Sequence, residues 1–119
     1  MVRLEPRASW VDSQLEQADV VRAPHLIDAE VIGVIRRYVL QGQVDAHTGE
    51  RALADYEKLR MTRLPHMPLL RRVWELRDNV SAADGFYVAL AEVLGAPLVT
   101  TNASLARVPR LEIEIRAFA

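Results

Sequence analysis

Residues 81–102 read SAADGFYVALAEVLGAPLVTTN, and this stretch decides the fold. Ser81 is a good N-cap, and Asp84 makes a capping-box-like start with an acid at the positive end of the helix dipole. The apolar residues that follow lie nearly all round the helix, as in a helix buried between a sheet and other helices. Gly95 is placed to end this helix in the left-handed conformation, and Pro97 cannot continue it.

The segment that follows the helix predicts a buried strand. Residues 97–101, PLVTT, form a short apolar and β-branched run without alternation, which suits a strand covered on both faces. Three polar residues, Thr100, Thr101 and Asn102, stand at its carboxyl end. In open α/β sheets ligands bind at that edge, so the stretch predicts an α/β protein with a site near these residues.

The composition is that of a small globular domain without cysteine. Because 119 residues suffice for one hydrophobic core and are too few for two, we expect one domain over residues 1–119. Residues 1–8 are expected to be frayed. The net charge of −1 gives no global positive field, so any RNA contact needs a local basic patch. The lack of cysteine excludes disulfides, zinc–thiolate sites and a thiol nucleophile. We expect a cytoplasmic protein, since no apolar run approaches the roughly 20 residues of a membrane span.

The other elements are expected from capping residues and hydrophobic spacing. In chain order these are a helix over 9–18, a strand over 19–22, a helix from Pro24 to about Leu40, a helix from Asp45 or Thr48 to about Leu59, an extended segment over 61–64, a helix from Pro68, a helical turn over 102–106 and a strand over 111–118. Strands separated by helices imply βαβ units and a mostly parallel sheet.

Carboxylates are the candidates for chemistry. The three histidines lack metal-binding spacing, and no nucleophile elbow, P-loop or dinucleotide fingerprint is present. Asp28 and Glu30 lie in one helical turn, and Glu30 interrupts the apolar side of its helix. A carboxylate that faces a core is costly unless it is paired or binds a metal. Asp84 has the same character at the head of a mostly apolar helix.

Simpler structural roles for these residues stay open. Asp84 can serve only as a helix cap, and Asn102 only as the N-cap of the turn that follows it. Glu30 can be solvated beside Arg36 or Arg37, which themselves form an ordinary charged helix face.

Two segments together resemble a known family. They are APHLIDAEVIGVIRR, residues 23–37, and LPHMPLLRRVWELRDNVSAADGFYVALAEVLGAPLVTTNASLA, residues 64–106. Their order, spacing and flanking residues are similar to those of the VapC toxins of bacterial toxin–antitoxin pairs, which are small PIN-domain ribonucleases. The likeness runs from about residue 10 to the end. It implies a three-layer α/β/α sandwich on a mostly parallel sheet.

The resemblance implies endonucleolytic RNA cleavage that depends on Mg²⁺ or Mn²⁺. Glu30 matches the family's acid on the second helix, and Asp84 matches the metal-binding acid that heads the later helix. Asn102 falls where the family usually has another aspartate. We therefore expect Glu30 and Asp84 to be catalytic and to bind the metal, with Asn102 as a third ligand. Oxygen ligands suit such hard cations.

The resemblance also reveals a departure from the family. The family begins with a hydrophobic strand inside the sheet that ends in a principal metal-binding aspartate, and we expect this sequence to lack that strand. Its matched cluster holds two carboxylates where the family would have four, so impaired activity is expected. Dimerisation, recruitment of a strand, a shift of the chain's own strands, or a longer natural protein would each compensate for the missing strand.

The function expected from the resemblance is that of a toxin of a type II toxin–antitoxin system. A VapB-like antitoxin would lay an apolar helix in a groove and cover the acidic site with basic residues. A homodimer is expected by resemblance only. The phosphate contacts to RNA are assigned to four arginines: Arg36, Arg37, Arg71 and Arg72. The alternatives are a catalytically dead PIN remnant that binds the antitoxin or another protein, and a metal-free structural domain.

Overall fold

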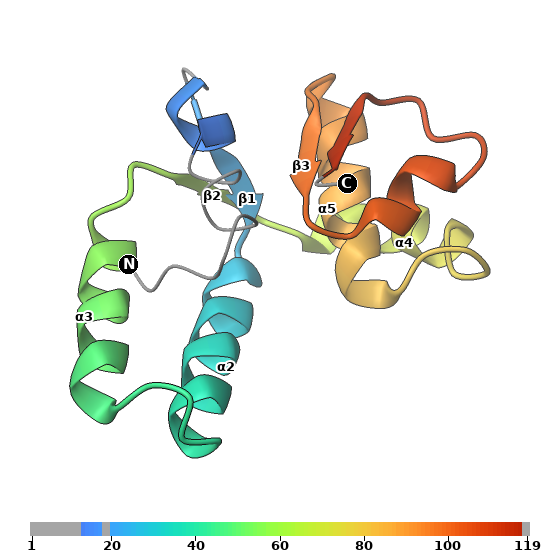
Figure 1. Ribbon diagram of the computed structural model, residues 1–119. Coiled ribbons are helices and arrows are strands. Elements are labelled where there is room, and N and C mark those ends of the chain that lie inside the picture. Colours follow the sequence, from blue (N-terminus) through green and yellow to red (C-terminus); the bar gives the residue numbers. More distant parts are fainter. Residues whose placement is uncertain (1–12, 18–19, 118–119) are drawn as a thin grey trace.

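A computed structural model describes residues 13–17 and 20–117 of the chain (Figure 1). The expected frayed segment, residues 1–8, lies outside the described residues. Residues 13–17 are helical, in agreement with the part of the expected first helix that can be compared.

The secondary structure follows most of the expected elements. In chain order these are β1 (Arg22–Pro24), α2 (Ile27–Leu40), α3 (Ala46–Glu57), β2 (Thr62–Leu64), the 3-10 helix η1 (Met67–Leu69), α4 (Leu70–Glu75), α5 (Ala82–Leu94), β3 (Leu98–Thr100), the 3-10 helix η2 (Ala103–Arg107) and β4 (Ile115–Ala117). The last strand is therefore much shorter than the expected one over residues 111–118.

The position of Pro24 corrects the sequence-based prediction. Pro24 was expected in the first turn of a helix, but it ends β1, and α2 begins at Ile27. The backbone N–H of His25 donates to the carbonyl of Leu64 at 3.0 Å. Since successive residues of a strand face opposite sides, the nitrogen of Pro24 points away from β2. A proline costs no ladder hydrogen bond at such a position.

Helix α5 has the capping that its sequence predicts. The hydroxyl of Ser81 accepts a hydrogen bond from the backbone N–H of Asp84 at 3.3 Å. Gly95 ends the helix in the left-handed conformation, with φ of 61°. Residues of α5 belong to both hydrophobic clusters found among the described residues, and Val88 and Ala89 are fully buried.

The strands form two parallel pairs. β1 pairs with β2, β3 pairs with β4, and no hydrogen bond joins the two pairs within the described residues. The expected parallel pairing is therefore confirmed, whereas the expected single sheet is not seen in this part of the chain. Each strand has only three residues, and one strand of each pair, β1 or β3, contacts α5. Helix α5 thus connects the two pairs.

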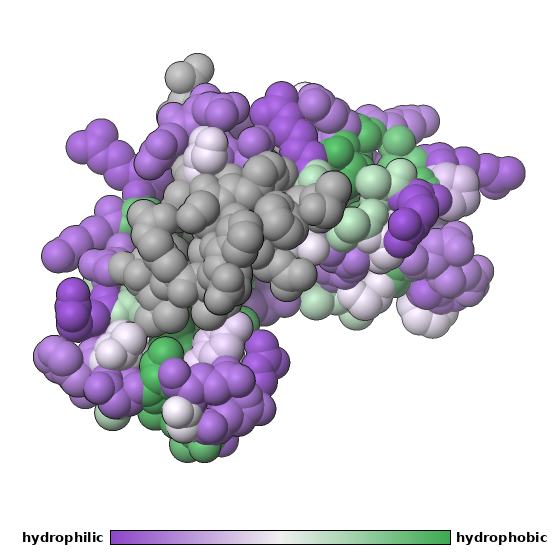
Figure 2. All heavy atoms as spheres, in the orientation of Figure 1, coloured by the Kyte–Doolittle hydropathy of each residue, from purple (hydrophilic) through white to green (hydrophobic). Residues whose placement is uncertain are grey.

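Helices α2 and α3 form a hairpin that projects on the side of the molecule away from α4, β3 and β4 (Figure 1). Helix α2 has no buried residue, and several of its apolar side chains, including Ile32 and Leu40, are exposed. Among the coloured residues of Figure 2 most are hydrophilic, and hydrophobic residues appear between these two helices and, at the upper right, around β3. No helix in the described ranges combines the length and the apolar content needed to cross a membrane.

The hairpin is held to β2 by one carboxylate. Asp28 of α2 accepts hydrogen bonds from the Tyr56 hydroxyl of α3 at 2.6 Å and from Nε of Arg63 of β2 at 2.9 Å. These two donors lower the pKa of Asp28, with Tyr56 as the larger influence. As expected from the sequence, the carboxylate of Asp45 caps α3 by accepting from the backbone N–H of Thr48 at 2.7 Å.

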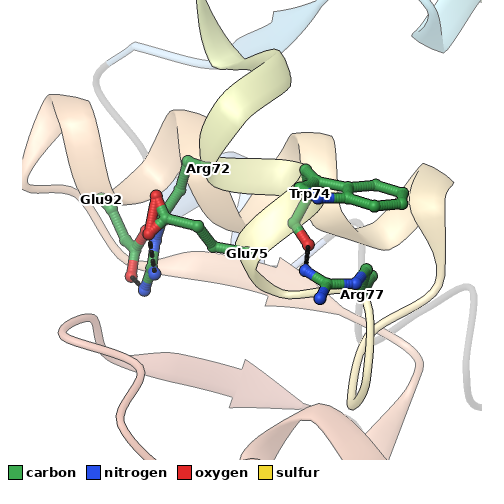
Figure 3. A network of polar contacts seen from close by, with 5 residues as sticks. All are labelled: Arg72, Trp74, Glu75, Arg77 and Glu92. Carbon is green, nitrogen blue, oxygen red and sulfur yellow. Dashed lines mark hydrogen bonds and ion pairs between the residues drawn. The ribbon is translucent and has the colours of Figure 1, made fainter.

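An ion pair holds α4 to α5 (Figure 3). Arg72 donates two hydrogen bonds to the carboxylate of Glu92, from Nε at 2.7 Å and from Nη2 at 2.9 Å. Glu75 lies further from the same guanidinium, at 3.7 Å. The hydrogen bond from Arg72 lowers the pKa of Glu92 below its ordinary value of 4.5. Just after α4 the guanidinium of Arg77 stacks over the ring of Trp74 of that helix, at 4.5 Å from the ring centroid.

Glu92→Gln is expected to reduce the free energy of unfolding at pH 7 by about 1 kcal/mol, because it removes the charge from a two-hydrogen-bond pair. Since the pKa of Glu92 is lowered by folding, its contribution is complete above pH 4.5 and is lost as the pH falls through the folded-state pKa. Urea unfolding at pH 7 and at about pH 3, where a carboxyl group is largely protonated, should show the difference from wild type shrinking with acidification.

Glu75→Gln is the matched control for that prediction. Its carboxylate faces the same arginine, but its side chain is 63% exposed against 14% for Glu92. Exposed pairs contribute little, so this variant should stay close to wild type. Equal losses for the two variants would contradict the assignment of the stabilisation to Glu92.

Gly85→Ala is expected to destabilise the protein by about 1–3 kcal/mol, because α4 and α5 approach each other closely at this residue. A methyl group on Gly85 would lie 2.9 Å from Cγ1 of Val73, and valine has little rotamer freedom with which to move aside. Thermal unfolding measures the loss. Gly33→Ala is the control, since a methyl group there meets no atom within 4 Å and should stabilise α2 by roughly 0.5–1 kcal/mol.

Candidate functional site

The amino end of α5 and the carboxyl end of β3 meet at Asp84. This residue lies in the first turn of α5, where the helix dipole favours a negative charge. Its Oδ2 accepts a hydrogen bond from Nδ2 of Asn102 at 3.1 Å. Because Asn102 follows the end of β3, this hydrogen bond brings the strand end and the helix start together at the place where the sequence predicts a site.

Asn102 has the capping role that the sequence allowed, and it also contacts the expected site. Its Oδ1 accepts from the backbone N–H of Ser104 at 3.1 Å and from the Ser104 hydroxyl at 2.5 Å. A backbone N–H can only donate, so the oxygen of the amide must face Ser104 and the nitrogen must face Asp84. In this arrangement Asn102 holds Asp84 through its nitrogen, while its carbonyl oxygen is engaged in capping η2.

The end of β3 is fixed by Thr100. Its Oγ1 accepts a hydrogen bond from the backbone N–H of Asn102 at 3.0 Å. This bond closes a local turn that sends the chain from the strand into η2. Thr101 is exposed and makes no side-chain hydrogen bond among the described residues. Of the two threonines at the strand end, Thr100 therefore positions the asparagine.

The second acid, Glu30, reaches toward α5 from the first turn of α2. The hydroxyl of Tyr87 donates a hydrogen bond to Oε1 of Glu30. Tyr87 follows Asp84 by three residues, so both side chains lie on one face of α5. The tyrosine ring packs against the core cluster that contains Leu76 and Val88. The site thus joins residues 30, 84 and 102, which lie far apart in the sequence.

The environment of Tyr87 keeps its hydroxyl protonated. Burial of the ring raises the pKa of Tyr87 most, and the hydrogen bond to Glu30 and the negative charges of Glu30 and Asp84 raise it further. A protonated hydroxyl is a permanent donor to Glu30. The sequence analysis did not identify Tyr87. The available signal was its spacing of three residues from Asp84 on the same helix.

Asp28 does not belong to the site. Its carboxylate is bound to Tyr56 and Arg63, as described above, and it ties α2 to α3 and β2. The two acids in the first turn of α2 therefore have different partners. Asp28 is paired with a cation, whereas Glu30 receives a hydrogen bond from a neutral hydroxyl and makes no ion pair among the described residues.

The set of oxygen donors is small. Within the described ranges no group of three or more His, Cys, Asp or Glu side chains is placed to hold a metal ion. The site offers two carboxylates and one amide. Their oxygen atoms are hard donors, whereas the amide nitrogen is not a metal ligand. Mg²⁺ is commonly held by one or two carboxylates, with water and substrate phosphates as its other ligands. Glu30 and Asp84 therefore fit a hard divalent ion that is shared between protein and substrate.

The four arginines that are expected to contact RNA differ in whether they form an ion pair. Arg36 and Arg37 of α2 and Arg71 of α4 are exposed and make no ion pair within the described part of the chain. Arg71 lines a shallow groove with Leu70, Trp74 and Glu75. Arg72 is engaged with Glu92. Three of the four guanidinium groups are thus exposed and without an ion-pair partner among the described residues.

Comparison with known proteins agrees with the resemblance. The sequence model of the PIN domain matches residues 1–111. The chain is 42% identical to VapC ribonuclease Mb0985 of Mycobacterium bovis over 92 residues, which are 77% of this chain and 72% of that protein. It is 41% identical to ribonuclease VapC1 of Mycobacterium tuberculosis over 103 residues, 86% of this chain and 77% of the relative.

A third relative, ribonuclease VapC12 of Mycobacterium tuberculosis, is 40% identical over 91 residues, which are 76% of this chain and 70% of the relative. No solved structure matches the chain. The PIN match covers most of the residues, and the identities extend over more than two thirds of each relative. This chain therefore belongs to the PIN domain family.

Proposed function

We propose that this protein is the toxin of a type II toxin–antitoxin system and cleaves RNA endonucleolytically with the help of a divalent metal ion. The observation that carries the proposal is the hydrogen bond from Tyr87 of α5 to Glu30 of α2, because Tyr87 follows Asp84 by three residues and the negative charge of Asp84 acts on its hydroxyl. This pair of acids lies in a chain that is 40–42% identical to proteins named VapC ribonucleases.

In this proposal Glu30 and Asp84 hold Mg²⁺ or Mn²⁺ together with the RNA phosphate. The bound ion supplies a Lewis acid for the phosphate and lowers the pKa of a water molecule. The protein holds both acids in place: Asp84 lies at the positive end of the α5 dipole, the amide of Asn102 restrains its carboxylate, and Tyr87 restrains Glu30. Asn102 is assigned to positioning, because its oxygen caps η2.

RNA binding is assigned to the unpaired arginines. The net charge of −1 leaves no general attraction to a polyanion. Arg36, Arg37 and Arg71 are exposed and free of ion pairs in the described residues, so they can contact phosphates without breaking an existing interaction. Such contacts would position the backbone of the RNA and carry no sequence information. Arg72 is assigned to stabilising α4 on α5.

The proposed partner is a VapB-like antitoxin, and the proposed location is the cytoplasm, with no membrane association. The exposed apolar side chains of Leu70 and Trp74, in the shallow groove on α4, support a partner that contributes an apolar helix. A homodimer is also proposed, on the resemblance alone. The whole of residues 1–119 is proposed to form one three-layer domain, which the contacts of α5 with both β1 and β3 support.

A second candidate function is a binding module without catalysis. The observation that favours it is the small number of ligands, since the described residues bring together only two carboxylates, and one of them is engaged by the amide of Asn102. Such a protein would still bind the antitoxin through its apolar surface. It would fold and bind without cleaving RNA.

RNA cleavage by the wild-type chain is expected to require Mg²⁺ or Mn²⁺ and to stop with a chelator. Asp84→Ala and Glu30→Gln should each reduce the rate by at least about 100-fold, because each removes one of two charged ligands. Gel analysis of a labelled RNA mixture measures the rate. Asp28→Asn is the control on the same helical turn as Glu30, and it should leave the metal dependence unchanged.

Two results would oppose the catalytic proposal. Cleavage that persists in chelator would show that the metal is not needed. A folded wild-type chain that binds the antitoxin and cleaves no RNA with either metal would favour the binding module.

Asn102→Asp is expected to tighten Mn²⁺ binding by about tenfold, because ligand charge tunes the affinity of oxygen sites. The new carboxylate can still cap η2, but it would repel Asp84, so the melting temperature without metal should fall. Calorimetric titration with Mn²⁺ and thermal unfolding in chelator measure the two effects. Asn102→Ser keeps a capping oxygen without the charge. Equal Mn²⁺ affinities for the two variants would contradict this prediction.

A further inference from the structure

We infer that Tyr87 is a positioning residue of the active site, which sets the metal affinity by holding the carboxylate of Glu30 at the face of α5 that carries Asp84. This inference rests on the proposed function. It adds Tyr87 to the two acids and Asn102, with a role distinct from that of the acids.

The first support is the isolation of Glu30. Helix α2 packs mainly against α3 and has no buried residue of its own. Within the part of the chain that the structure describes, no side-chain hydrogen bond other than that of Tyr87 with Glu30 joins α2 to α5. Without this bond the carboxylate of Glu30 would depend on its own rotamers for its distance from Asp84.

The second support is the rigidity of the donor. Tyr87 lies in the middle of α5, next to the fully buried Val88, and its ring packs against the hydrophobic cluster of that helix. Tyrosine has two side-chain torsions, and both are restrained when the ring is packed. The hydroxyl therefore presents a fixed point to which the longer side chain of Glu30 is attached.

The third support is the way in which the hydrogen bond leaves Glu30 able to bind a cation. Tyr87 donates to Oε1, and Oε2 has no hydrogen-bond partner in the described residues. A neutral hydroxyl restrains the carboxylate without cancelling its charge, as an arginine would. Asp28, one half-turn earlier, shows the other outcome, because Arg63 occupies both of its oxygens.

Helix α5 carries both Asp84, a proposed metal ligand, and Tyr87, which positions the other proposed ligand, Glu30. Asp84 and Tyr87 are three residues apart on α5, so their separation is fixed by helix geometry. Partners that orient metal-binding carboxylates commonly change metal affinity by 10- to 100-fold when they are removed. Here the restraint also works against the mutual repulsion of Glu30 and Asp84, which would otherwise drive the two carboxylates apart when no cation is present.

The test compares Tyr87→Phe with Tyr56→Phe in the full chain. Each variant removes one hydroxyl that donates to a carboxylate of α2, but Tyr56 donates to Asp28, outside the site. Calorimetric titration with Mn²⁺ alone is expected to show an affinity about tenfold weaker for Tyr87→Phe and close to wild type for Tyr56→Phe. Circular dichroism and thermal unfolding in chelator confirm that each variant is folded.

A double-mutant cycle separates positioning from general stability. If Tyr87 acts through Glu30, Tyr87→Phe should cost no further Mn²⁺ affinity once Glu30→Ala is present. A loss of equal size in both backgrounds would overturn the inference, because it would mean that Tyr87 acts through the helix as a whole. The cycle remains informative even where single variants melt at a lower temperature, since titrations can be run well below the melting point.

Asp84→Asn distinguishes failure of this inference from failure of the proposed function. If Asp84→Asn weakens Mn²⁺ binding while Tyr87→Phe and Tyr56→Phe bind alike, the inference about Tyr87 is overturned and the metal site stands. If the wild-type chain binds no Mn²⁺, or if Asp84→Asn binds it as well as wild type, the proposed metal site falls and the inference falls with it.

Discussion

The burial of α5 is the constraint on which the rest of this structure depends. A helix that is apolar nearly all round must be covered on several sides, and here α4, β1 and β3 share that task. Gly85 permits α4 to approach closely, and Arg72 and Glu92 secure the same contact. Because the core forms around α5, its first turn is held firmly, and that turn carries Asp84.

The site illustrates how one fold gives similar groups different tasks. Asp28 and Glu30 lie two residues apart in α2, and each accepts a hydrogen bond from a tyrosine. Asp28 also binds Arg63 and so connects α2 to α3 and β2. Glu30 meets no cation in the described residues and remains available to a ligand. The neighbouring charge, rather than the type of residue, decides which carboxylate is structural.

Membership of the PIN family and the geometry support one another, but at different levels. The family match covers residues 1–111 and gives the class of protein. The geometry identifies which polar groups meet, and it reveals that Asn102 turns its amide nitrogen toward Asp84. It also reveals that the described strands form two short parallel pairs linked by α5, where the sequence led us to expect a single sheet. Strand periodicity predicts that strands exist and does not specify which edges pair.

The sequence by itself determined the features that depend on neighbouring residues. Ser81 and Asp45 cap their helices, Gly95 ends α5, and the apolar run before Thr100 forms a strand, because capping, left-handed turns and β-propensity are local effects. Only the tertiary structure decided what depends on distant residues. Pro24 joined a strand because the pairing with β2 left its nitrogen unneeded, and Tyr87 met Glu30 across 57 residues of sequence. A local sequence pattern does not predict such contacts, because they form only when separate elements pack together.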